Sequence, residues 1–162
     1  MKQENKHLLE SLMEINRQKA EEVRKLQNRK IEEDDRFLKE FERVKKEIIS
    51  PVMEDVGRQL ERYGHVCDIV LQEEIQDQDG KIRNASIALY IFPEGKRGWR
   101  FDSIPSVVFY GIKFSRKVWI HRSTMVPAQG GAVGAVGEFS LEELSSDFVE
   151  HKIMDCLQDI FV

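Results

Sequence analysis

Residues 8–49 contain neither glycine nor proline, and this uninterrupted stretch limits the fold more than any other feature of the sequence. Glu, Lys, Arg, Gln and Leu dominate it, and these straight-chain residues lose little side-chain freedom in a helix. Apolar residues recur along it at helical spacing, at Leu8, Leu12, Ile15, Val23, Leu26, Phe37, Phe41, Val44 and Ile48. The pattern predicts one continuous helix roughly 60 Å long.

An eleven-residue spacing recurs within this apolar stripe, at Ile15, Leu26, Phe37 and Ile48. Such a spacing favours a nearly straight or weakly right-handed contact between helices. A stripe this narrow on a helix this charged is not stable alone in water. We therefore expect the same helix of a second subunit to cover it. The predicted interface consists of Leu12, Ile15, Val23, Leu26, Phe37, Phe41 and Val44.

The pair Ser50-Pro51 predicts a change of direction, because proline disfavours helical geometry in the residue before it and is tolerated at the first helical position. Two alternatives stay open here: a second helix over residues 51–63 that Ser50 caps, or one helix kinked at Ser50. Gly64 predicts the end of this helix. The expected domains are residues 1–49, a charged helix for oligomerisation or partner binding, and residues 50–162, a head.

Alternating apolar residues in the head predict four strands, over residues 66–75, 83–92, 106–114 and 117–123. An acidic turn ending in Gly80 and the short link at 115–116 favour antiparallel hairpins. Residues 127–137 are rich in glycine and predict a loop. Ser140 and Glu143 have the spacing of a capping box that opens a last helix.

The predicted fold class is therefore α+β. It comprises a long N-terminal helix, a short second helix, a four-stranded antiparallel β-meander and a C-terminal helix packed on the sheet.

Composition argues against several classes of protein. No apolar run approaches the ~18 residues of a membrane span, and no signal-peptide pattern is visible. Two cysteines cannot form a disulfide framework, so we expect a cytoplasmic protein with Cys67 and Cys156 in its core. The net charge of −4, with no basic region in bulk, argues against nucleic acid as the main partner.

Motifs for catalysis, metals or cofactors are missing from the sequence. The four histidines lie in different predicted elements without metal-ligand spacing. The glycine-rich segment is followed by Glu138-Phe139-Ser140 rather than the Lys-Ser/Thr of a phosphate loop. We therefore predict no catalytic residue, no metal and no cofactor.

One ligand site is nevertheless a hypothesis, at the end of the fourth predicted strand near the glycine-rich segment. Its candidate residues are His121, Arg122, Arg100 and Tyr110. Trp99, Trp119 and nearby basic residues also suggest stacking on single-stranded nucleic acid, which we favour less.

The leading hypothesis for function is a non-enzymatic interaction or scaffold protein, a homo-oligomer and preferably a dimer, whose head contacts a protein partner. One alternative is a small acidic dimeric chaperone-like protein, because the helix–sheet–helix order is similar to that of type III secretion chaperones. The other is a ligand-binding or catalytic domain. The sequence does not set the direction in which the long helices pair.

Overall fold

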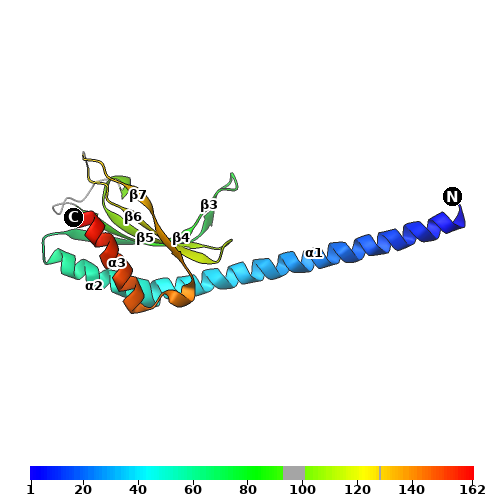
Figure 1. The fold of residues 1–162 in the computed structure, drawn as a ribbon, viewed down its shortest axis with the longest axis horizontal. Coiled ribbons are helices and arrows are strands. Elements are labelled where there is room, and N and C mark those ends of the chain that lie inside the picture. The colour runs from blue at the N-terminus through cyan, green and yellow to red at the C-terminus, as the bar shows by residue number, and fades with distance from the viewer. Residues whose placement is uncertain (93–100, 128) are drawn as a thin grey trace. The chain divides into compact units, whose positions relative to one another are not determined.

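The computed structural model describes residues 1–92, 101–127 and 129–162 (Figure 1). The chain divides into two compact units, Met1–Arg36 and Phe37–Val162. The division lies before Ser50, where the sequence predicted a boundary, because residues between 37 and 49 belong to the core of the second unit.

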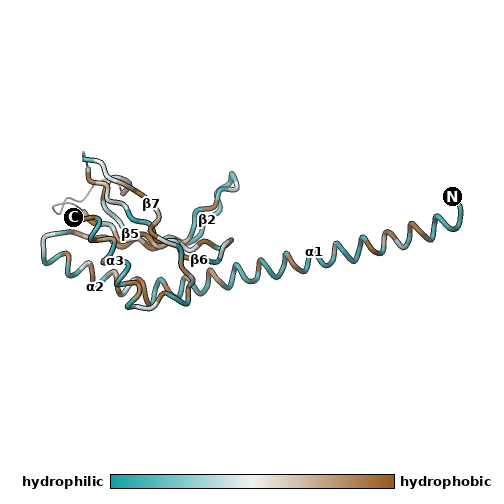
Figure 2. The backbone as a smooth tube through the Cα atoms, viewed as in Figure 1, coloured by the Kyte–Doolittle hydropathy of each residue, from teal (hydrophilic) through white to brown (hydrophobic). Residues whose placement is uncertain are grey.

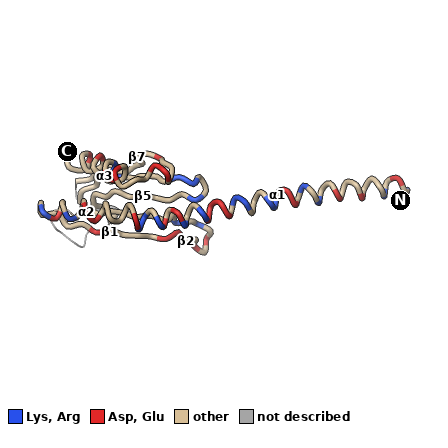
Figure 3. Tube along the Cα trace, turned by 90° about the horizontal axis from the view of Figure 1, so that it is seen from below, with Lys and Arg blue, Asp and Glu red and all other residues tan. Residues whose placement is uncertain are grey.

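The first unit is helical and highly charged. It contains the greater part of α1 (Gln3–Val44). Apolar residues recur between hydrophilic ones along this helix (Figure 2), and basic and acidic residues are interspersed along it (Figure 3). Arg17 forms ion pairs with Glu14 at 2.7 Å and with Glu21 at 4.0 Å. Among the described residues, no helix is both long enough and apolar enough to cross a membrane.

The second unit begins with helical residues that continue without a break through Pro51. A π-helical turn, η1 (Lys45–Ile49), joins α1 to α2 (Ser50–Glu61). The Ser50 N–H donates to the carbonyl of Lys45, five residues earlier, and Ser50 has helical backbone angles. The wide turn lies directly ahead of Pro51, which has no N–H to donate to it. Ser50 therefore lies inside a helical run and is not an N-cap.

Gly64 ends α2, as the sequence predicted. Its φ is +89°, a conformation that glycine adopts at little cost. The Gly64 N–H donates to the Glu61 carbonyl at 3.1 Å, and the His65 N–H donates to the Leu60 carbonyl at 3.2 Å. These two bonds form a Schellman motif.

The main sheet has five antiparallel strands in the order β1-β4-β5-β6-β7. Their bounds are β1 (Val66–Gln72), β4 (Ala85–Phe92), β5 (Ser106–Ile112), β6 (Lys117–Ser123) and β7 (Val133–Phe139). Two short strands, β2 (Ile75–Gln76) and β3 (Ile82–Arg83), pair as a separate hairpin between β1 and β4. The α+β class and the meander order are as predicted, with one strand more.

The additional strand, β7, lies mostly within the segment predicted to be a glycine-rich loop. It pairs with β6, and the register shifts between Ile120 and His121. The Phe139 ring covers Gly137, because a Cβ built on Gly137 would lie 2.6 Å from the ring. Pairing with a neighbour and this aromatic cover stabilise a strand that contains two glycines, which are depleted in strands.

The C-terminal helix begins later than predicted. Ser140 and Glu143 do form a capping box, with the Ser140 N–H donating to the Glu143 carboxylate at 2.7 Å. It opens only a 3₁₀ turn, η4 (Leu141–Glu143), and α3 (Ser146–Phe161) follows. Ser145 caps α3, because its hydroxyl accepts a hydrogen bond from the Phe148 N–H. A further 3₁₀ turn, η3 (Phe101–Ser103), precedes β5.

The core lies between one face of the main sheet and the helices of the second unit, which lie on the same side of the sheet (Figure 1). Ile87, Phe109 and Ile120 are cross-strand partners and form a buried row across β4, β5 and β6. The helical residues packed on this face include Phe41, Val44, Ile49, Met53, Val149, Ile153 and Leu157. The predicted packing of the last helix on the sheet is therefore present.

Three residues of the predicted oligomer interface belong to this core. Phe37, Phe41 and Val44 are 6%, 0% and 1% exposed. These three side chains pack within their own chain. They are therefore not available to a second subunit as an exposed stripe. The stripe that stays exposed lies before them, in the first unit.

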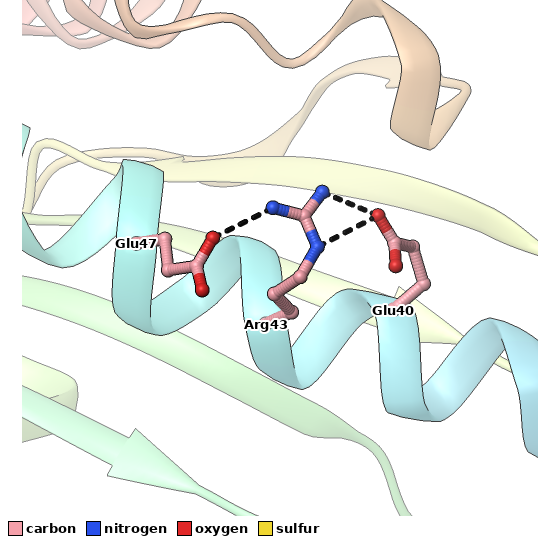
Figure 4. A network of polar contacts seen from close by, with 3 residues as sticks. All are labelled: Glu40, Arg43 and Glu47. Atoms are coloured by element: carbon pink, nitrogen blue, oxygen red, sulfur yellow. Dashed lines mark hydrogen bonds and ion pairs between the residues drawn. The ribbon is translucent and has the colours of Figure 1, made fainter.

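The outer side of the same helical segment is polar. Arg43 donates hydrogen bonds to Glu40 at 3.0 Å and to Glu47 at 2.7 Å, and all three side chains are exposed (Figure 4). The hydrogen bond from Arg43 holds the pKa of Glu40 below its usual value. Residues 40–47 are thus amphipathic, with an apolar side in the core and a solvated side.

Candidate functional site

The face of the main sheet opposite the core carries several aromatic residues. Tyr110 on β5 and Trp119 on β6 are cross-strand partners, and His121 follows Trp119 on the same face. Alternation places them there, because their neighbours Phe109 and Ile120 are buried in the core. We call this the open face.

The aromatic rings of the open face lie close together. The ring centroids of Tyr110 and His121 are 4.9 Å apart in an edge-on arrangement, and those of Trp119 and His121 are 6.3 Å apart. A shallow hollow of about 440 Å³ lies over them. Its lining residues are Asn84, Tyr110, Ile112, Ser115, Trp119 and His121. We call it the aromatic hollow.

Charge is nearly absent from the aromatic hollow at neutral pH. Burial lowers the pKa of His121 below 6.5, and burial raises the pKa of the Tyr110 hydroxyl. Both groups are therefore neutral at pH 7. Lys113, in the turn after β5, is paired with Glu74 at 3.0 Å. Apolar rings with a few neutral polar groups suit a small neutral ligand or an apolar side chain of a protein partner.

The structure brings together two of the four residues predicted to bind a ligand. Tyr110 and His121 both line the aromatic hollow. Arg122 lies on the other face of β6, where its guanidinium forms an ion pair with Asp159 of α3. Arg100 lies outside the described residues. Arg122 therefore contributes to the packing of α3 rather than to the hollow.

Sequence reasoning left four of the lining residues out of the ligand site: Asn84, Ile112, Ser115 and Trp119. The period of two along β6 is the signal that groups Trp119 with His121 and excludes Arg122. Asn84 and Ser115 lie outside the main-sheet strands, so no strand pattern could assign them to this face.

Neither free cysteine is suited to nucleophilic chemistry. Burial, with Glu61 and Asp68 nearby, raises the pKa of the Cys67 thiol to about 11. Burial also raises the pKa of the Cys156 thiol to about 11. Both thiols stay protonated at neutral pH and are poor nucleophiles. Within residues 1–92, 101–127 and 129–162, no cluster of three His, Cys, Asp or Glu side chains could hold a metal ion.

A second candidate surface is the apolar stripe of the first unit. Five of its residues lie on one side of α1 because they are spaced by three, four or eight positions. Their exposed fractions are Leu8 58%, Leu12 49%, Ile15 49%, Val23 52% and Leu26 63%. We call these five residues the exposed stripe. They include four of the seven residues predicted to form an oligomer interface.

Comparisons with protein families, curated proteins and solved structures gave no match to this chain. The chain itself presents two candidate surfaces: the exposed stripe of the first unit and the aromatic hollow of the second.

Proposed function

We propose that this chain is a non-enzymatic scaffold or interaction protein that self-associates through its first unit. The exposed stripe carries the proposal, because each of its five residues is about half exposed or more. Burying such apolar surface is favourable by about 25 cal/mol per Å². An isolated helix, in contrast, gains little stability from its own hydrogen bonds. A second copy presents the same stripe and covers it.

Charge in the first unit is compatible with pairing between identical chains. Residues 1–36 carry nine basic and nine acidic side chains, so their net charge is zero. Identical helices therefore do not repel each other through a net field. The charges are also interleaved along the helix (Figure 3), which is common on the solvated sides of paired helices.

If the first units associate, their thermal stability increases with protein concentration. The melting temperature of the helix, followed by circular dichroism at 222 nm, then rises as the concentration is raised, because folded chains associate and unfolded chains do not. We expect such a rise between about 2 and 200 μM, in the transition that reports the long helix. A midpoint independent of concentration would show that the helix is stable without a partner.

The aromatic hollow supports a second candidate function, the binding of a small ligand. It gathers Tyr110, Trp119 and His121 around about 440 Å³, a volume within the range of ligand sites. A screen of small aromatic fragments by NMR on the full chain tests it. Fragments that shift resonances of the parent but not of a Trp119→Ala variant with unchanged melting temperature would support a ligand site. If Trp119→Ala lowers the melting temperature and no fragment binds to the parent, the rings contribute to packing and not to a ligand site.

We also propose that the protein is cytoplasmic. Both Cys67 and Cys156 are free thiols, as is usual for proteins of a reducing compartment.

A further inference from the structure

Resting on the proposed self-association, we infer that two copies pair through their first units in an antiparallel orientation. Leu8 of each copy then lies against Leu26 of the other, and Arg17 lies near the twofold centre. The exposed stripe of one copy thus contacts the exposed stripe of a second copy, and the two helices have a defined direction and a defined register.

Two lysines lie within the exposed stripe and decide the direction. Steps of three and four residues place Lys19 between Ile15 and Val23, and place Lys30 after Leu26, on the same side of the helix. The two lysines are eleven residues apart, so they occupy equivalent positions of the eleven-residue spacing. Any partner helix that covers the stripe therefore has to accommodate both ammonium groups.

A parallel, in-register pair opposes identical residues. Lys19 would face Lys19 of the second copy, and Lys30 would face Lys30, in the centre of the contact. Two like charges in a contact partly removed from water repel each other more strongly than they do in bulk solvent. Lysines at such positions are tolerated in paired helices, but they select against arrangements that oppose them.

An antiparallel pair centred near Arg17 avoids both contacts. Lys30 then faces Glu4 of the second copy, and the pair is repeated by symmetry. Lys19 faces Ile15, against which its aliphatic stem can pack while the ammonium group reaches water. The remaining layers are apolar: Leu8 lies level with Leu26, and Leu12 packs against Val23, one residue from the level position.

The two arrangements differ little in apolar contact but strongly in charge. The parallel pair has five apolar layers, at the five residues of the exposed stripe, and two layers that oppose lysines. The antiparallel pair has four apolar layers. Two Glu4–Lys30 pairs replace the Lys30–Lys30 contact, and two Lys19–Ile15 layers replace the Lys19–Lys19 contact. One fewer apolar layer is offset because the Lys30 repulsion becomes an attraction to Glu4, and the Lys19 repulsion is removed as each Lys19 stem packs on Ile15.

The length of the first unit also fits the antiparallel register. With the centre at Arg17, the layers of the contact run from Glu4 to Lys30 of each copy. Both residues lie within the unit Met1–Arg36. The contact therefore uses residues of the first units alone, and the whole exposed stripe is covered.

Cysteine cross-linking of the full chain tests the inference. Leu8→Cys and Leu26→Cys variants are oxidised separately and as a mixture, with the parent chain as the control for Cys67 and Cys156. In the antiparallel pair, the two cysteines introduced by Leu8→Cys lie about 27 Å apart along the axis, too far for a disulfide. We expect a covalent dimer from the mixture, and no dimer above the parent level from either variant alone.

A covalent dimer from Leu8→Cys alone would overturn the inference in favour of parallel helices. A dimer in solution that cross-links in none of the three reactions would overturn the register. A parent chain that sediments as a monomer would instead remove the proposed self-association itself, so the two failures are distinguishable.

A charge exchange gives a second readout that needs no cysteine. Glu4→Lys opposes lysines in the antiparallel pair and is expected to weaken dimerisation several-fold, and adding Lys30→Glu is expected to restore it. Failure of the second substitution to restore the dimer would contradict the Glu4–Lys30 contact.

Discussion

The ring of Phe41 lies directly on the backbone of Gly111. A Cβ built on Gly111 would be 2.4 Å from Cδ1 of Phe41, which is closer than real atoms approach. Phe41 comes from the end of α1 and Gly111 from β5, so the helix contacts the sheet where one residue has no side chain. This contact explains why Phe41 is fully buried within its own chain.

Gly111→Ala is therefore expected to destabilise the second unit by about 1–3 kcal/mol, because the methyl group overpacks the core. Urea denaturation measures the change. Phe41→Ala is expected to cost about 3–5 kcal/mol alone. The double variant should cost less than the sum of both, since removing the ring makes room for the methyl group.

Gly134→Ala is the matched control, because nothing lies within 4 Å of a Cβ built there. We expect a change within about 0.5 kcal/mol for it. Strict additivity of Phe41→Ala and Gly111→Ala would contradict the contact between ring and backbone.

Lys45 is a buried cation on the π-helical turn, and its removal is a second prediction. Its ammonium group donates to the carbonyl of Gln72 at 2.9 Å and pairs with the Glu42 carboxylate at 2.7 Å. Lys45→Met keeps the aliphatic stem but leaves these acceptors without their donor. We expect a loss of about 1–3 kcal/mol in the free energy of unfolding. Lys46→Met, on the same turn but exposed, is the control, and an equal loss there would contradict the structural role of Lys45.

The packing of α3 on the sheet gives a third prediction. Leu157 is 6% exposed within the core, and Leu157→Ala is expected to cost about 2–5 kcal/mol. Met154, on the same helix, is 46% exposed, so Met154→Ala should change stability by less than about 1 kcal/mol. Equal effects in thermal or urea unfolding would show that α3 is not held by its buried side.

The fourth prediction is a pH dependence that arises from His121. Burial lowers its pKa in the folded chain below the reference value of 6.5. As the pH falls below 6.5, the unfolded chain binds this proton more readily than the folded chain, so stability decreases. His121→Gln removes the effect.

Urea unfolding at pH 7.5 and at pH 5.5 measures the effect. The free energy of unfolding of the parent minus that of His121→Gln should be greater at pH 7.5 than at pH 5.5. An equal difference at both pH values would contradict the burial of the imidazole.

Local signals predicted much of this fold. Gly64 marked the end of α2, and the alternation in β4, β5 and β6 marked the meander. β7 was missed because Gly134 and Gly137 carry no strand signal of their own. Its structure comes from pairing with β6 and from the ring of Phe139, which are contacts between residues that a local pattern does not identify.

Helical periodicity located the apolar stripe but could not say what covers each part of it. Phe37 and Leu26 are eleven residues apart and look equivalent in sequence, yet Phe37 is 6% exposed and Leu26 is 63% exposed. The difference arises from the sheet, because only the residues from Phe37 onward belong to the unit that contains it. In the candidate site, the period of two already separates His121 from Arg122.

Sedimentation equilibrium of the full chain is the most direct test of the central claim that the exposed stripe holds two copies together. The parent is compared with Leu12→Glu/Leu26→Glu and with a control, Gln3→Glu/Asn28→Glu, which adds the same charge on the opposite side of the helix. We expect a dimer for the parent and the control at micromolar concentration, and a monomer for the stripe variant. A monomeric parent, or a stripe variant that stays dimeric, would contradict the account.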